Sequence, residues 1–205
     1  VIVLGAREGR FSKSGETKSL VPFAASSIPL VTLGTFLLWF GWFGFNGFSQ
    51  LAMGTFDDVN AISKIAVNTH LAGAAGTVAA AVITRLLGGK TDIVMMLNGA
   101  LAGLVAITAE PLTPSPLLAI AIGAIGSLIM YFGTKFLESK KIDDVVGAIP
   151  VHMFAGIFGT LVVPLSNSGT NFGTQLTGVI SVCVFSFVLS YITFRVLNQT
   201  IGLRI

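Results

Sequence analysis

The sequence has 205 residues, of which 53% are hydrophobic and only 10% are charged, and its mean hydropathy is +0.87. Soluble domains carry about 25% charged residues, so this composition excludes an ordinary soluble protein and indicates an integral membrane protein of one domain, residues 1–205. The net charge of +3 does not indicate nucleic acid as a partner, because the basic residues are spread over loops at the predicted membrane edges.

The chain opens with a short apolar stretch, Val1 to Ala6, which is too short for a membrane span or a signal peptide. We interpret it as the end of a helix whose start is missing. The absence of an initiating methionine supports this interpretation, and we expect the chain to be a fragment of a longer protein. Residues 7–26 then form a polar, basic loop.

Six apolar runs follow, each long enough to cross a bilayer as a helix. They cover residues 27–48, 60–87, 93–109, 116–136, 145–165 and 174–197. Continuous runs of this kind exclude a membrane β-barrel, whose strands alternate apolar and polar residues. The predicted fold is therefore an all-α polytopic membrane protein with six transmembrane helices. Small residues at four-residue spacing, such as Gly99 with Gly103, predict close helix packing.

The lysines and arginines predict the orientation of the helices. When the loops are assigned to alternate sides, eleven of the 12 basic residues fall on one side and Lys64 alone falls on the other. The side with eleven is expected to be cytoplasmic. We therefore predict a multi-pass protein of the cell membrane, in contact with lipid, whose six-span unit has both ends in the cytoplasm.

His152 is the first candidate functional residue. It lies eight positions past Asp144, and on a helix this offset of roughly 12 Å places the imidazole deep in a ~30 Å hydrocarbon core. An ionisable residue at that depth usually faces a cavity and marks a functional site. A neutral imidazole has one donor and one acceptor nitrogen, so it could guide a polar solute or relay a proton. The alternative is a neutral imidazole that is hydrogen-bonded to a neighbouring helix.

The end of the first run carries an aromatic cluster that includes Trp42 and Phe45, with Ser49 one turn further on. Aromatic rings at membrane edges often serve as anchors. Aromatic faces also attract small cations, and Ser49 adds a hydroxyl, so a cation-recruiting outer vestibule is the more specific hypothesis. His70 lies near mid-depth of the second run. It is either pore-associated or part of an interhelical hydrogen bond near Asn68 and Thr69.

Other chemistries find no support in the sequence. Neither histidine has a cysteine or carboxylate at ligand spacing, so we predict no metal site. The zinc signature H-E-x-x-H, the nucleophile motif G-x-S-x-G and a nucleotide-binding loop are all absent. We therefore predict no cofactor and no enzymatic activity. The single cysteine, Cys183, excludes an internal disulfide.

Four motifs carry a resemblance to a known family, and they occur in the same order and at similar spacing there. The motifs are Gly41-Trp-Phe-Gly-Phe-Asn46, Ala102-Gly-Leu-Val-Ala-Ile-Thr108, Ile142-Asp-Asp144 followed by Val151-His152, and Gly202-Leu-Arg204. Together they make the chain similar to the ammonium transporter family over essentially all 205 residues. The similar part is the second half of that fold, from the end of the fifth span through spans six to eleven.

The resemblance implies a homotrimer of eleven-helix subunits, each with its own pore. Ammonium is recruited at an outer aromatic site, passes a phenylalanine gate and is deprotonated, and ammonia then crosses an apolar pore lined by two histidines. By position, His152 is similar to the second of these histidines. The resemblance further assigns Phe45 to the gate, Trp42 to the position behind it, Ser49 to recruitment and Thr108 to the eighth span. Family members often bind a PII-type signalling protein on the cytoplasmic face.

The sequence departs from the family pattern around His152. Glycine usually flanks the Val-His pair, whereas Pro150 and Met153 stand here, and Gly147 replaces an aspartate. We expect Pro150 to kink its helix. These departures motivate an alternative function, an ammonium sensor of the same fold with a signalling domain beyond Ile205. A third possibility is a purely structural subunit that binds no ammonium.

Overall fold

The computed structural model describes residues 1–11 and 23–203. Lys13 and Lys18, two of the basic residues behind the predicted orientation, lie outside the described residues. So does Arg204, the last residue of the fourth motif. The six predicted runs all form helical segments: α1 Ile28–Gly47, α2 Phe56–Gly88, α3 Ile93–Thr108, α4 Pro116–Ser139, a composite fifth segment, and α6 Phe172–Thr200. The fifth segment joins the π-helix η2 Ile149–Phe154, α5 Ala155–Val162 and the short 3-10 helix η3 Val163–Leu165, and a second 3-10 helix, η1 Phe48–Gln50, extends α1.

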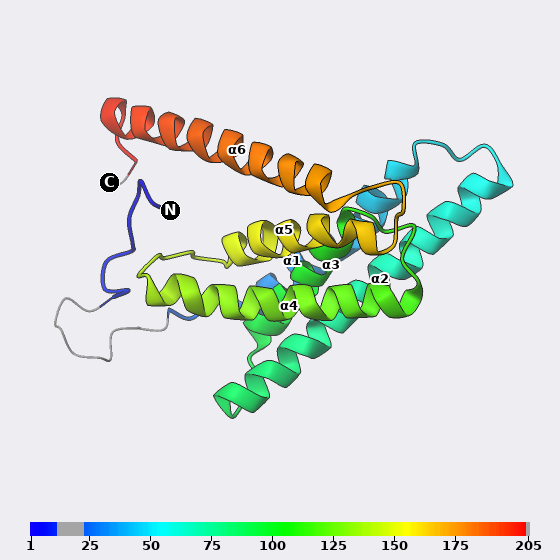
Figure 1. Cartoon of the computed structure of the whole chain (residues 1–205). Coiled ribbons are helices and arrows are strands. Elements are labelled where there is room, and N and C mark those ends of the chain that lie inside the picture. The colour runs from blue at the N-terminus through cyan, green and yellow to red at the C-terminus, as the bar shows by residue number, and fades with distance from the viewer. Residues whose placement is uncertain (12–22, 204–205) are drawn as a thin grey trace.

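Four of the helices, α1, α2, α4 and α6, are long and apolar enough to cross a membrane by length and composition. The other two apolar segments, Ile93–Thr108 and Ile149–Leu165, are shorter. Successive segments run in alternating directions, so the two ends of the chain lie at the same end of the molecule (Figure 1). The last helix, α6, lies along the edge of the bundle, and none of its residues is buried.

Side-chain caps fix where the helices begin. Ser27, Asp92 and Asn171 each accept a backbone N–H from the first turn of the helix that follows. Thr55 and Asp58 form a capping box, in which each side chain accepts the other residue's backbone N–H. This box starts α2 at Phe56, so the start predicted near residue 60 was wrong. The helix extends back to Phe56 because the side chains of Thr55 and Asp58 satisfy free N–H groups at its start.

The start of the fifth segment also differs from the prediction. Helical geometry was expected from residue 145, but it begins at Ile149, because Gly147 adopts a left-handed conformation with φ +77° that ends any continuous helix. His152 therefore lies about one turn into its helix, and the predicted helical offset of eight residues from Asp144 was wrong. Pro150 lies at the start of the segment, inside the π-helical turn, and the kink expected from it stays a prediction.

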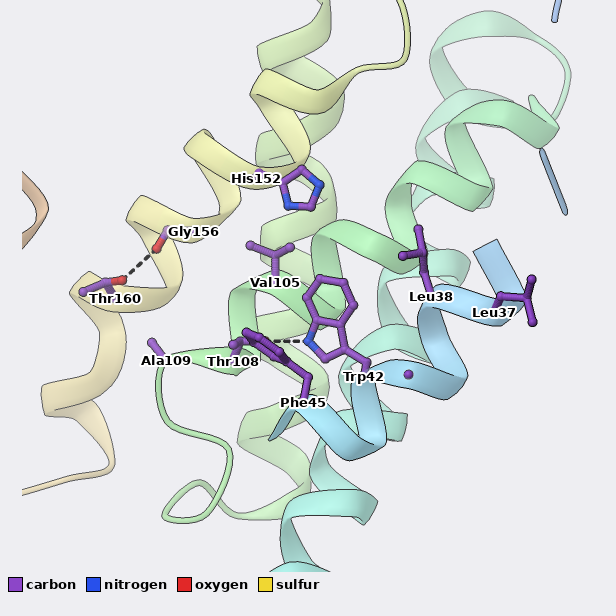
Figure 2. A pocket seen from close by; sticks show the side chains of 11 residues that line it. Leu37, Leu38, Trp42, Phe45, Val105, Thr108, Ala109, His152, Gly156 and Thr160 are labelled. Carbon is purple, nitrogen blue, oxygen red and sulfur yellow. Dashed lines mark hydrogen bonds between the residues drawn. The ribbon is translucent and has the colours of Figure 1, made fainter. Parts of the chain in front are cut away.

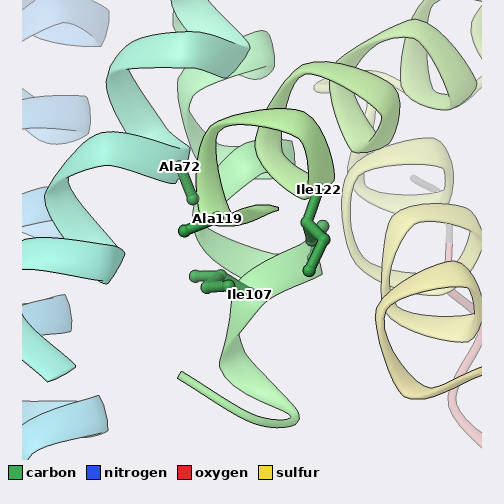
Figure 3. Close-up of a cluster of buried hydrophobic side chains, with 5 residues drawn as sticks. Ala72, Ile107, Ala119 and Ile122 are labelled. Carbon is green, nitrogen blue, oxygen red and sulfur yellow. The ribbon is translucent and has the colours of Figure 1, made fainter. Parts of the chain in front are cut away.

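Helices α2, α3 and α4 pack with their backbones in contact. A Cβ atom added to Gly103 on α3 or to Gly123 on α4 would overlap the Ala72 backbone of α2, so each of these positions requires glycine. Beside this contact lies a cluster of buried apolar side chains from the same three helices (Figure 3), namely Ala72, Ala106, Ile107, Ala119 and Ile122. The predicted close packing at small residues is confirmed.

Buried amides join the helices at one end of this core. The Asn46 Nδ2 on α1 donates to Thr69 Oγ1 on α2 at 2.9 Å. The neighbouring Asn68 donates to the carbonyls of Pro111 and Pro114, both at 2.9 Å, in the loop between α3 and α4. Hydrogen bonds of this kind hold apolar helices together without any help from water.

We predict that Gly123→Ala destabilises the protein by about 2 kcal/mol, because the new methyl group forces α4 away from α2. The measurement is thermal unfolding of the complete native gene product in detergent. Gly34→Ala is the matched control, since open space surrounds that helical glycine, and it should leave the midpoint unchanged or raise it slightly. Equal effects of the two substitutions would contradict the packing of α2 against α4.

Candidate functional site

An apolar cavity of about 560 Å³ lies between α1, α3 and the fifth segment (Figure 2). The two shorter helices supply two of its walls, and the last turns of α1 supply the third. Its lining residues are Leu37, Leu38, Gly41, Trp42, Phe45, Val105, Thr108, Ala109, His152, Gly156 and Thr160. Four of the predicted site residues, Trp42, Phe45, Thr108 and His152, therefore meet in one cavity although up to 110 positions separate them in the sequence.

The imidazole of His152 projects into this cavity from the π-helical turn (Figure 2). Within residues 1–11 and 23–203, no protein group hydrogen-bonds to it, so both ring nitrogens remain available to a solute. Gly156 and Thr160 follow on the same wall at four-residue spacing. All three also line a second cavity of about 630 Å³ that opens toward α6. The interhelical hydrogen bond considered as an alternative for His152 is not formed among the described residues.

Trp42 and Thr108 form a closed pair on the opposite side of the cavity. The indole Nε1 donates to Thr108 Oγ1 at 2.7 Å, and this hydroxyl donates to Leu104 O at 2.6 Å (Figure 2). Thr160 is likewise satisfied, because its hydroxyl donates to Gly156 O at 2.9 Å. The polar side chains on these walls are thus occupied by the protein itself, with the exception of His152. A solute in the cavity meets hydrocarbon, aromatic rings and one free imidazole.

Phe45 stands beside Trp42 at the end of α1. The two rings meet edge to face, with their centroids 5.9 Å apart, and the side chain of Phe45 is 65% exposed. Ser49 lies one turn beyond Phe45 and outside the cavity lining, with its hydroxyl donating to Phe45 O at 3.0 Å. The structure therefore brings Phe45 to the cavity and places Ser49 next to the Phe45 backbone.

His70 is not part of this cavity. Its ring stacks against Phe43 with a centroid separation of 6.2 Å and lies 5.6 Å from Trp39, in a tilted arrangement. Trp39 and Phe43 occupy the face of α1 that packs on α2, whereas Trp42 and Phe45 occupy the face toward the cavity. The two histidines therefore contact different faces of α1, and His152 is the one that lines the cavity. Near His70, its neighbour Thr69 accepts an interhelical hydrogen bond from Asn46, and Asn68 donates to carbonyls of the loop between α3 and α4.

The residues that sequence reasoning missed are apolar or small: Leu37, Leu38, Gly41, Val105, Ala109, Gly156 and Thr160. A signal for two of them was available, since Gly156 and Thr160 follow His152 at i+4 and i+8 and must share its helical face. The missed lining residues of α1 and α3 carry no such signal, because they are apolar residues or glycine among neighbours that are mostly apolar as well. Among the described residues, no group of three or more histidine, cysteine or carboxylate side chains could hold a metal ion.

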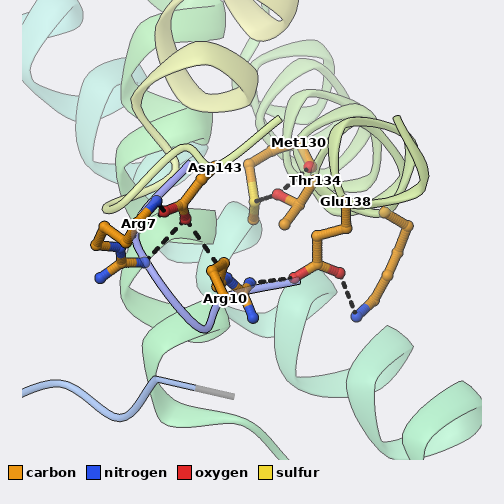
Figure 4. A network of polar contacts seen from close by, with 7 residues as sticks. Arg7, Arg10, Met130, Thr134, Glu138 and Asp143 are labelled. Atoms are coloured by element: carbon orange, nitrogen blue, oxygen red, sulfur yellow. Dashed lines mark hydrogen bonds and ion pairs between the residues drawn. The ribbon is translucent and has the colours of Figure 1, made fainter. Parts of the chain in front are cut away.

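A polar network ties the N-terminal segment to the loop that precedes His152 (Figure 4). Asp143 accepts the backbone N–H of Arg7 at 2.9 Å and both its Nε and Nη2, at 2.8 and 2.9 Å. Arg10 lies 3.4 Å from the same carboxylate and donates to Glu138 Oε1 at 3.2 Å. The Arg7 hydrogen bonds hold the pKa of Asp143 at about 2, below its ordinary 3.8. Burial of the carboxylate opposes this shift.

Comparisons with known proteins agree on one family. The model of the Ammonium Transporter Family matches residues 1–205. Ammonium transporter Amt2 of Archaeoglobus fulgidus is 37% identical over 225 residues, which cover 100% of this chain and 47% of that protein. A putative ammonium transporter of Synechocystis, sll0537, is 39% identical over 215 residues, covering 100% of this chain and 38% of that protein.

Solved structures show the same fold. A structure titled Sensor Amt Protein superposes with a TM-score of 0.88 at 34% identity, covering 100% of this chain and 51% of that one. Mep2 of Candida albicans superposes with a TM-score of 0.79 at 26% identity, covering 88% of this chain and 43% of that one. The chain therefore spans about half the length, or less, of the proteins it matches.

We predict that Asp143→Asn destabilises the protein by about 1 to 2 kcal/mol at pH 7, after allowance for solvent screening of the partly exposed Arg7. Because folding lowers the pKa of Asp143, its contribution is fully present above about pH 4 and is lost as the pH falls toward 2. The native protein and the variant should therefore converge in thermal midpoint between pH 4 and pH 2. A constant difference across that range would contradict the ion pair.

Proposed function

The chain belongs to the ammonium transporter family, and on that premise we propose that it is a subunit, or part of one, through which ammonium nitrogen crosses the membrane as ammonia. One observation carries the proposal: the free imidazole of His152 on the wall of an apolar cavity. The family assignment and the membrane-capable helices identify a multi-pass membrane protein that is not an enzyme. The route and the residue roles that follow belong to the proposal.

The chemistry of the cavity wall favours a neutral solute. A bare charge at the centre of a bilayer costs at least ~3 kcal/mol, and the walls of this cavity present no carboxylate to offset that cost. Ammonium that gives up a proton before entry becomes a small neutral base, which an apolar wall does not repel. His152 can accept a hydrogen bond from ammonia at one ring nitrogen, or take and return the proton.

The aromatic end of the cavity is the proposed entrance. Phe45 and Trp42 present ring faces and edges there, and aromatic faces attract small cations such as ammonium. Phe45 is one of the residues of the proposed phenylalanine gate, since its exposed ring stands at the edge of the cavity. Ser49, one turn further out, would contribute its hydroxyl to recruitment, and Thr108 would hold Trp42 in place through the 2.7 Å hydrogen bond.

Orientation and assembly complete the proposal. We place the end of the bundle that carries Arg7 and Arg10 in the cytoplasm, because basic residues gather on that side. The loops after α1 and α3 then face outward. We also propose assembly as a homotrimer and, on the cytoplasmic face, contact with a PII-type regulator or a fused signalling domain. The homotrimer and the cytoplasmic partner come from the resemblance to the family.

The second candidate function is ammonium sensing. The likeness to the structure titled Sensor Amt Protein, at 34% identity and a TM-score of 0.88, favours it. A sensor would bind ammonium saturably and pass little of it. The sequence of the complete gene beyond Ile205 distinguishes sensing from transport, because a signalling domain there supports sensing. Ammonium uptake close to background, with ammonium binding intact, supports sensing independently.

The first test is ammonium uptake by cells that lack their own transporters and express the complete native gene. We predict that His152→Ala lowers uptake about 100-fold or more, because proton handling by a positioned side chain contributes on this order. His70→Ala is the matched variant. Since His70 lies outside the cavity, its loss should change uptake less than about twofold.

The proposal fails if His152→Ala transports as the native protein does while the native protein itself transports ammonium. A loss in His70→Ala as large as that in His152→Ala would instead place His70 in the pathway. Phe45→Ala should alter the dependence of uptake on ammonium concentration, because it changes the entrance rather than the histidine.

A further inference from the structure

The loop between α4 and the fifth segment determines where His152 sits. This loop, residues 140–148, leads directly into the π-helical turn that carries the imidazole. A π-turn is wider than an α-turn and is tolerated only where its surroundings hold it. Besides the contacts of Asp143 with Arg7 and Arg10, three further contacts hold the turn and the loop before it. Two of them lie within the segment itself, and the third comes from α3, which forms the facing wall of the cavity.

The internal contacts set the register of the helix. Asp144 Oδ2 accepts the backbone N–H of Ile149 at 2.6 Å, so this carboxylate satisfies a free donor at the start of the segment. The backbone N–H of Val151 donates to Gly147 O at 3.1 Å. Val151 itself is 2% exposed and packs on buried residues of α3 and α4. His152 follows Val151 directly, so its ring direction depends on this register.

The contact from α3 is made by Asn98. Its Nδ2 donates to Val146 O at 3.1 Å, across 48 positions of sequence. The same amide lies against Gly147, where an added Cβ would come within 2.7 Å of Nδ2. Gly147 also has φ +77°, which side chains other than glycine rarely adopt. Asn98 and Gly147 therefore fit together as a clamp on the chain just before His152.

Asn98 also lies on the same helix as the cavity wall. Val105 and Thr108 line the cavity two and three turns further along α3. A bond from α3 to the loop thus fixes the separation between this wall and the helix that carries His152. Asn98 itself does not line the cavity. We propose that Asn98, through the Val146 carbonyl and Gly147, is a positioning residue that sets the orientation of the His152 imidazole.

This proposal rests on the proposed function for its effect on transport, but its structural content can be tested without transport. The probe is solid-state NMR of the complete native protein in lipid bilayers, with ¹⁵N-labelled histidine. The His152 signals are identified by their absence in His152→Gln. Asn98→Leu has a similar volume and removes the donor, so we expect the ¹⁵N signals of the His152 ring nitrogens to shift.

Asn167→Leu is the matched control. Asn167 is also a half-buried amide that joins two segments, donating to Glu110 Oε2 at 2.8 Å near the opposite end of α3. It should leave the His152 signals unchanged. If Asn98→Leu is not recovered from the membrane, Gly147→Ala disrupts the same clamp from the other side, and the same shift is expected. Unchanged His152 signals in the recovered variant, or an equal shift in Asn167→Leu, would overturn the proposal.

Uptake by the same variants provides a second readout. Asn98→Leu should lower the maximal rate of ammonium uptake about tenfold, as loss of a supporting contact to a functional group commonly does. The ammonium concentration that gives half-maximal uptake should change less than twofold. Asn98→Gln, which keeps the amide donor, should recover part of the rate. If the native protein takes up no ammonium, the transport proposal fails while the NMR result still decides the role of Asn98.

Discussion

The low polarity of the cavity is the constraint on which the rest of the structure depends. Trp42 donates to Thr108, Thr108 donates to Leu104, and Thr160 donates to Gly156, so these polar side chains have no free group to offer a charged solute. A cation in this space would lose its water and gain little in return. The free imidazole of His152 supplies one donor and one acceptor nitrogen, which suits a neutral base that can still hydrogen-bond.

A rigid frame supports this cavity. Helices α2, α3 and α4 meet through their backbones at Gly103 and Gly123, which leaves no room for one helix to slide against another. The wall formed by α3 is therefore fixed, and the clamp from Asn98 extends that rigidity to the loop before His152. On the far side of the loop, Arg7 holds Asp143 through its backbone and its guanidinium. The imidazole of His152 thus sits on a helix that is anchored from two directions.

Much of this architecture could be predicted from the sequence, because helix number follows from apolar runs and from polar breaks between them. The bounds of α3 and α4 were predicted within a few residues from their apolar runs, and in the structure Asp92 and Ser115 cap the starts of these helices. The start of α2 was missed because the predicted run began at residue 60, after the Thr55–Asp58 capping box that starts the helix. The fifth segment was mispredicted because a left-handed Gly147 and a π-turn leave no periodic signal. The grouping of Trp42, Phe45 and Thr108 with His152 came from the family resemblance, and the Asn98 contact with Val146 depends on tertiary packing that hydropathy does not encode.

The central claim is that nitrogen crosses without its charge, and ion selectivity tests it most directly. Potassium and ammonium ions are similar in size and charge, but only ammonium can release a proton. The complete native protein, reconstituted in liposomes, should transport ammonia down an ammonium gradient. It should pass no potassium ions under an equal potassium gradient. Potassium flux at a comparable rate would contradict the account, since it would show that the cavity carries an intact cation.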